Sequence, residues 1–135
     1  MKLPNYDQAV VSQVKITGIL LSMTRPEKRE RAKFFFDLGF SAEAWEELAQ
    51  ALRRHAANHS VAKVEDSTYG LQYIIDGILL TPSGETPPVR SIWFVPTGES
   101  VPRFITAYPI QAEEQYTVRQ ILTSRGTALR LPRMG

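Results

Sequence analysis

Apolar positions recur every three or four residues in much of the first 60 residues of the chain, which predicts three helices. The first is expected over residues 12–23, although Gly18 weakens it. The third is expected over residues 42–58, after a cap at Ser41. Glutamates occupy its first turn and arginines its last, as the dipole of a helix favours.

The second helix begins with a recognisable signal. Thr24 can cap its first turn, and Glu27 follows three residues later, as a capping box requires. Pro26 suits the first turn because its fixed backbone angle is already helical. Gly39 is a natural stop, so the helix is predicted to end at about Leu38.

The pattern changes at Ser60 to runs rich in β-branched and aromatic residues, separated by turn residues. Consecutive strands joined by short turns favour an antiparallel meander. The sequence therefore predicts an α+β fold, with N-terminal helices packed on a small antiparallel β-meander of three to four strands. Strands are expected at residues 61–65, 68–80, 89–95 and 103–110, with a shorter one at 9–11.

Residues 1–110 are expected to form a single α+β domain. Residues 111–135 are expected to be a C-terminal extension, with a short helix at about 113–122 followed by a loosely held basic tail. No stretch of the sequence has the length and apolarity of a signal peptide or a membrane span, so no membrane association and a cytoplasmic location are expected.

The amino-acid composition excludes several kinds of functional site. The chain has 135 residues, 43% of them hydrophobic, and a formal net charge of +2. It contains no cysteine, which excludes disulfides and thiolate metal sites. Two histidines, His55 and His59, are too few for a stable metal site, and no glycine-rich phosphate loop is present. We therefore expect neither a metal nor a cofactor.

The positive charge is unevenly distributed. A basic run begins at Arg25, and on a helix Arg29 and Lys33 lie one turn apart. Such a stripe can contact phosphate groups. The alternative is an ordinary solvated helix face, which is the more common meaning of a single charged run.

The last strand carries candidate chemistry. Thr106 and Tyr108 are two residues apart, so regular alternation places them on one face, together with Phe104, while Arg103 points the other way. Arg90 lies on the preceding strand. A hydroxyl, a phenol and cationic side chains can cleave RNA without a metal, because they can move protons and stabilise charge on a phosphate. The alternative is that Thr and Tyr are simply common in strands.

Several stretches of the sequence resemble an uncharacterised bacterial family of small proteins, a domain of unknown function common in cyanobacteria. The resemblance covers about residues 1–110 and leaves the tail outside. It brings no established activity with it. The stretches are Lys2-Leu3-Pro4-Asn5, the Arg-Ala-Lys-Phe-Phe-Phe-x-Leu-Gly-Phe segment at 31–40, Val89-Arg90-Ser91-Ile92-Trp93, and Pro102 to Pro109.

A looser resemblance is to toxin nucleases of the barnase, colicin and RelE type, which place helices before a small antiparallel sheet. Some tRNA-cleaving members have a Thr-x-Tyr pair on a late strand, which Thr106 and Tyr108 match. Their helical basic groups would correspond to Lys33 or Arg29. The sequence departs from them because the segment around Lys33 contains no histidine, and His55 lies on the next helix.

Three functions follow as hypotheses. The first is a metal-free ribonuclease of bacterial toxin type that acts on RNA such as tRNA. Its catalytic residues would be Thr106, Tyr108, Lys33 and Arg90, and its substrate-binding residues Arg29, Arg103 and His55. The second is a non-catalytic protein-interaction module, such as a degenerate toxin relative or regulatory partner, which would bind a cognate protein or form a homo-oligomer. The third is a nucleic-acid binder without chemistry.

Overall fold

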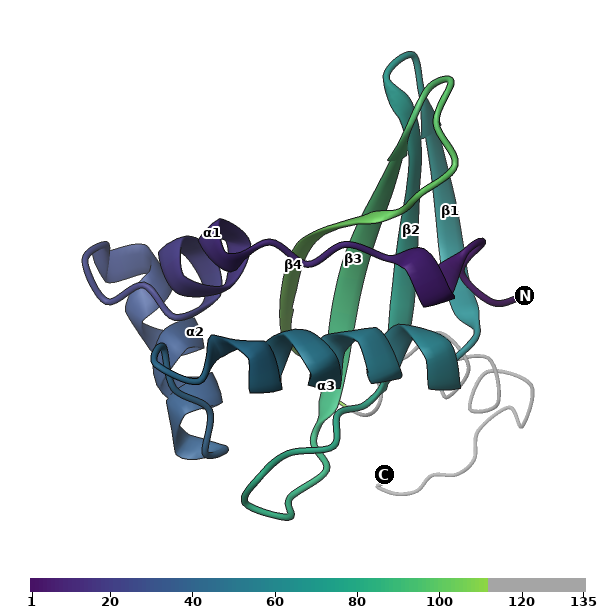
Figure 1. Ribbon diagram of the computed structural model, residues 1–135. Coiled ribbons are helices and arrows are strands. Elements are labelled where there is room, and N and C mark those ends of the chain that lie inside the picture. The colour runs from purple at the N-terminus through teal and green to yellow at the C-terminus, as the bar shows by residue number, and fades with distance from the viewer. Residues whose placement is uncertain (112–135) are drawn as a thin grey trace, which may run out of the picture.

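The computed structural model describes residues 1–111 of the chain, and in that part helices precede a four-stranded antiparallel sheet. The predicted α+β meander is therefore confirmed. Figure 1 shows α3 lying across one face of the sheet, with α1 and α2 gathered beside its β4 edge. The helix predicted at 113–122 lies outside the described residues. The elements are η1 (Tyr6–Gln8), α1 (Gln13–Lys15), η2 (Ile16–Leu20), α2 (Pro26–Asp37), α3 (Trp45–Asn58), β1 (Val61–Ser67), β2 (Gly70–Ile78), β3 (Pro88–Pro96) and β4 (Arg103–Pro109).

The first predicted helix is present but shorter than expected. Ser12 caps it by accepting a hydrogen bond from the backbone N–H of Lys15 at 3.3 Å. The α-helical turn of α1 passes directly into the π-helical turn η2, which ends at Leu20. The strand predicted before it reduces to a single parallel bridge between Val10 and Arg103.

The start of α2 differs from the prediction. The helix begins at Pro26 after Arg25, and no side chain caps this end. The capping box predicted from Thr24 is therefore wrong. The Thr24 hydroxyl instead lies 3.0 Å from the Ser22 hydroxyl, because the chain at Arg25 is extended and carries Thr24 out of reach of the first turn.

The end of α2 follows the prediction. Gly39 has a positive φ of 98°, a conformation that glycine adopts without steric cost. The backbone N–H of Phe40 then reaches back to the carbonyl of Phe35 at 3.2 Å, and their rings make an edge contact. This hydrogen-bonded turn ends the helix and directs the chain towards α3.

The helix α3 is the clearest amphipathic element. It begins at Trp45, three residues later than predicted, because Ser41 caps a preceding turn by accepting from the Ala44 N–H at 3.1 Å. Its apolar face packs against the sheet. The buried residues on that face are Leu48, Ala49, Ala51, Leu52, His55 and Ala56.

The sheet has two chemically different faces. We call the side that packs against α3 the inner face; it carries the buried side chains of Ile75, Ser91, Trp93 and Ala107. The opposite side is the outer face. Asp76 and Arg90, which are register partners on β2 and β3, lie on it because neighbouring strand residues point to opposite sides.

A β-bulge changes the facing of residues within β4. Ile92 pairs with Thr106, whereas the next residue, Trp93, pairs with Phe104. Ile105 is therefore an extra residue on β4, and the alternation of side chains shifts by one at that point.

The shift corrects two predictions from the sequence. Arg103, the register partner of Phe94, lies on the same outer face as Thr106 and Tyr108 and does not point the other way. Phe104 does not share a face with Thr106 and Tyr108. Phe104 is buried on the inner face against Trp93, with ring centroids 5.3 Å apart. Thr106 and Tyr108 are partly exposed on the outer face, opposite their register partners Ile92 and Arg90.

Candidate functional site

A polar cluster forms where α2 meets the outer face of β4. Arg31 of α2 donates a hydrogen bond from Nη1 to Thr106 Oγ1 at 2.9 Å. The Arg31 guanidinium also lies over the ring of Tyr108, with 5.8 Å between Cζ and the ring centroid. One cation therefore joins the hydroxyl and the phenol of the Thr-x-Tyr pair.

A second cation lies beside this cluster. Arg90, the register partner of Tyr108, forms a bidentate pair with Asp76, with distances of 2.7 Å from Nε to Oδ1 and 2.9 Å from Nη2 to Oδ2. The Asp76 side chain is 4% exposed and that of Arg90 17%. Hydrogen bonding to Asp76 raises the pKa of Arg90 above its ordinary value, and Tyr108 adds to the rise. Arg90 is therefore a fixed cation at any working pH.

The arrangement suits a bound phosphate. Arg31, Thr106, Tyr108 and Arg90 are all partly exposed, so a ligand can approach them from the outer face. Two guanidinium groups can stabilise negative charge on phosphoryl oxygens. The threonine hydroxyl can hold an oxygen in place, and the phenol can give a proton to a leaving oxygen. Asp76 fixes the orientation of Arg90.

The other basic residues named from the sequence lie apart from this cluster. Lys33 is exposed on α2. Arg29 is also exposed and donates to the Met23 carbonyl at 3.1 Å. Arg103 pairs with Glu99 at 2.7 Å near the other end of β4. Of the predicted residues, the structure brings together Thr106, Tyr108 and Arg90.

Two residues of this region, Arg31 and Asp76, were not predicted from the sequence as site residues. Arg31 belongs to the same basic run as Arg29 and Lys33, but it lies two residues from each, and on a helix that displacement moves a side chain to a different face. Only the packing of α2 selects which face meets β4. No sequence motif marks Asp76 as a site residue. Its partner Arg90 is 14 residues away, and only the register of the sheet brings the two side chains together.

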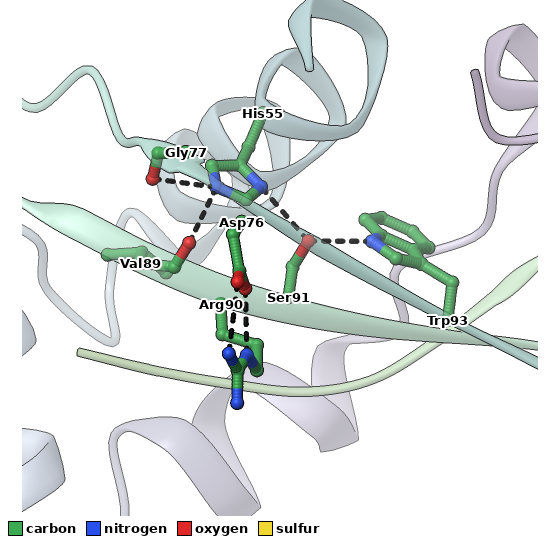
Figure 2. A network of polar contacts seen from close by, with 7 residues as sticks. All are labelled: His55, Asp76, Gly77, Val89, Arg90, Ser91 and Trp93. Atoms are coloured by element: carbon green, nitrogen blue, oxygen red, sulfur yellow. Dashed lines mark hydrogen bonds and ion pairs between the residues drawn. The ribbon is translucent and has the colours of Figure 1, made fainter. Parts of the chain in front are cut away.

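His55 occupies a different position, in a closed network on the inner face (Figure 2). Its Nε2 lies 3.1 Å from the Gly77 carbonyl and 2.9 Å from the Val89 carbonyl, so Nε2 carries the proton. Its Nδ1 accepts from the Ser91 hydroxyl at 2.9 Å. That hydroxyl oxygen accepts in turn from the Trp93 indole N–H at 2.9 Å.

This network requires a neutral imidazole. Burial lowers the pKa of His55 to about 4, and the nearby His59 contributes to the lowering. A proton on Nδ1 would break the bond from Ser91 and place a charge among buried apolar side chains. His55 is only 2% exposed. Its hydrogen bonds therefore tie α3 to β2 and β3.

The sheet separates His55 from the Thr106 and Tyr108 pair. Figure 2 shows His55 and Ser91 on one side of the strands and the Asp76–Arg90 pair on the other. The second histidine, His59, bonds the Ile78 carbonyl at 3.0 Å. We call Arg31, Arg90, Thr106 and Tyr108 the outer cluster. His55 therefore has no role in it, although the sequence suggested His55 as a substrate-binding residue.

Neither a metal-binding cluster nor a membrane-spanning helix occurs in residues 1–111. Among residues 1–111, His, Asp and Glu side chains do not gather in any group of three or more that could hold a metal ion. Over the same residues, the helices are too short or too polar to cross a membrane.

Comparisons with known proteins place the chain in a family. A family model described as "Domain of unknown function (DUF6883)" matches residues 2–111. The chain belongs to this family. The match spans almost the whole described part, including every residue of the outer cluster, and it bears out the family resemblance seen in the sequence. No curated protein matches the chain.

A solved structure shares the fold of this family member. It is a chain of a contact-dependent growth inhibition toxin–immunity protein complex from Klebsiella pneumoniae 342. The TM-score is 0.63 at 22% sequence identity, and the alignment covers 79% of this chain and 97% of that one. At this identity the likeness is one of fold.

Proposed function

We propose that the chain is a metal-free ribonuclease of the bacterial toxin type, with its site on the outer face of the sheet. The observation that carries the proposal is the contact of Arg31 with both Thr106 and Tyr108, beside the Arg90 cation. The fold shared with a chain from a toxin–immunity complex supports it.

The proposed reaction is transfer of a phosphoryl group within the RNA strand. The ribose 2′-oxygen forms a bond to the adjacent phosphorus, and the bond from phosphorus to the 5′-oxygen breaks. Tyr108 donates its phenolic proton to that 5′-oxygen and is reprotonated from water, which also takes up the 2′-hydroxyl proton. The products are a 2′,3′-cyclic phosphate and a 5′-hydroxyl end.

The cations stabilise the charge that develops in this step. Arg31 and Arg90 contact the non-bridging oxygens, and Thr106 orients one of them. Neither histidine lies on this face, since His55 and His59 both bond backbone carbonyls beside α3. We therefore assign the proton donation to Tyr108. Lys33 and Arg29, both exposed on α2, would at most attract the RNA over a longer distance.

The test is cleavage of tRNA and total RNA by the purified full chain in EDTA. We expect Tyr108→Phe, which removes only the phenolic oxygen, and Thr106→Ala to reduce the rate at least about 100-fold. Arg31→Ala should reduce it comparably. Arg29→Ala removes the same charge from the same helix away from the cluster and is the matched control. Equal rates in Tyr108→Phe and the unchanged chain would reject the assignment.

A non-catalytic protein-interaction module is the second candidate. It is favoured by the pairing already present in the cluster, where Asp76 holds Arg90 and Arg31 holds Thr106. Absence of cleavage at every salt concentration and pH, together with capture of one defined protein partner, would favour this function. Salt-dependent RNA binding without cleavage would instead indicate a nucleic-acid binder.

A further inference from the structure

A groove of about 290 Å³ lies at the N-terminal end of β4, where the sheet meets the start of α1. One wall is the segment that contains Ser12 and Lys15, and the other is formed by β3 and β4. Val10 holds the two walls together. Its N–H bonds the Pro102 carbonyl at 3.0 Å, and its carbonyl accepts from the Phe104 N–H at 2.9 Å.

The groove adjoins the outer cluster along the same strands. Ile105, which lines it, is the bulge residue directly before Thr106. On β3, Phe94 lines the groove and lies two residues from Ile92, the register partner of Thr106. Two residues along a strand span about 7 Å. That distance is of the order that separates successive phosphates in an extended single strand.

The groove combines an aromatic ring with positive charge. Lys15 and Arg103 contribute cations, and no acidic side chain is among its described lining residues. Glu99 pairs with Arg103 from outside, but both side chains are about half exposed, so the pair is weak and a phosphate can compete with it.

The ring of Phe94 is held in a defined position in this groove. Phe94 is partly exposed, and its ring lies against Gly70 of β2, where any side chain would collide with it. Aromatic rings beside cations are the features with which proteins hold single-stranded nucleic acids, because bases stack on the ring and phosphates meet the charges. An acidic peptide would use the cations but would have no need of the ring.

We propose that this groove binds the nucleotide next to the cleaved phosphate in single-stranded RNA. Phe94 stacks on its base, and Lys15 and Arg103 contact its phosphate. The inference rests on the proposed ribonuclease function and deepens it by naming a single-stranded substrate and a specificity-determining residue, Phe94.

The experiment measures binding of a fluorescent single-stranded RNA oligonucleotide to the full chain carrying Tyr108→Phe, in EDTA and across a salt series. Adding Phe94→Leu should weaken affinity about tenfold and leave the salt dependence unchanged, because stacking carries no charge. Adding Lys15→Ala should lower the slope of log affinity against log salt by about 0.7. Phe94→Tyr should restore the affinity, which a loss of folding would not allow.

Two control variants match these changes away from the groove. Arg54→Ala removes an exposed cation from α3, and Val64→Ala trims an exposed apolar side chain on β1. Both should leave affinity and salt slope unchanged. Equal affinities in Phe94→Leu and Val64→Ala would overturn the inference, as would an unchanged slope in Lys15→Ala.

The outcomes separate the subsite from the nuclease. Cleavage by the unchanged chain with no effect of Phe94→Leu on binding or KM would refute the subsite and leave the proposed function standing. Binding that depends on Phe94 and Lys15, in a chain that never cleaves RNA, would support the subsite and reject the nuclease. No binding at low salt would overturn the subsite.

Discussion

The two faces of one sheet carry two polar networks with opposite properties. On the inner face, His55, Ser91 and Trp93 form a closed set in which each named polar atom has a partner and solvent is excluded. On the outer face, Arg31 and Thr106 form a network that is partly exposed. Strands β2 and β3 supply both sides, with Gly77 and Ser91 bonded to His55 on the inner face and the Asp76–Arg90 pair on the outer face.

The difference shows that a buried polar group and a functional one are not the same. The inner network contains a histidine, which is the most common general acid or base in enzymes. Both of its ring nitrogens, however, are already hydrogen-bonded, one to Ser91 and the other to backbone carbonyls. The outer network contains a phenol and two guanidinium groups, and all three are partly exposed to solvent. Exposure to solvent, rather than residue type, distinguishes the candidate site from the inner network.

The largest effect on stability is expected from breaking the inner network. His55→Ala removes a buried ring and leaves Ser91 and two carbonyls without their partner. We expect the free energy of unfolding to fall by about 3 to 4 kcal/mol. Urea denaturation followed by circular dichroism measures this. His55→Gln, which keeps a donor and an acceptor, should cost clearly less, and equal losses in the two variants would contradict the network.

The inner network should also make stability depend on pH. The pKa of His55 is about 4 in the folded chain and 6.5 ordinarily, so between these values the unfolded state binds a proton that the folded state does not. Stability should therefore decrease as the pH falls from 6.5 to 4, by roughly 3 kcal/mol from this group. Urea denaturation at several pH values, compared between the unchanged chain and His55→Gln, isolates it. Parallel pH profiles would be evidence against a neutral buried His55.

A smaller effect is expected from the ion pair on the outer face. Asp76→Asn leaves the Arg90 cation without its carboxylate partner, and the Asp76 side chain is almost fully buried while that of Arg90 is partly exposed. We expect a loss of about 2 kcal/mol of unfolding free energy. Asp66→Asn, at an exposed position on β1, is the matched control and should have little effect. If the two variants were equally stable, the Asp76–Arg90 pair would make no contribution to the free energy of unfolding.

The smallest effect is expected at the surface pair beside the groove. Glu99→Ala breaks an ion pair in which both side chains are about half exposed, so solvent already screens it. The unfolding free energy should change by less than about 0.5 kcal/mol. RNA affinity should rise, because Arg103 is released for phosphate. A drop in affinity would show that Glu99 positions Arg103 for binding.

Local signals in the sequence predicted most of the fold. Gly39 ends α2 because it adopts a positive φ, and the amphipathic pattern of α3 matches its buried face. The change of pattern after Ser60 marks the sheet. These features depend on neighbouring residues along the chain, so the sequence carries them directly. The Thr24 cap failed because the backbone at Arg25 is extended, which a motif alone does not report.

The candidate site was predicted in part. Thr106 and Tyr108 share a face, as their spacing predicted, and alternation along β3 puts Arg90 on that face and Ser91 on the other. The Ile105 bulge moves Phe104 to the other side, and a single extra residue leaves no mark in the pattern of β4.

The sequence by itself determined the element order, the antiparallel meander and the spacing of the Thr106 and Tyr108 pair, because these depend on local propensity and alternation. Only the tertiary structure decided that Arg31 rather than Arg29 or Lys33 meets that pair, and that His55 is enclosed on the opposite face. Both outcomes depend on how α2 and α3 dock on the sheet. Docking is a sum of many distant apolar contacts, and no short stretch of sequence contains it.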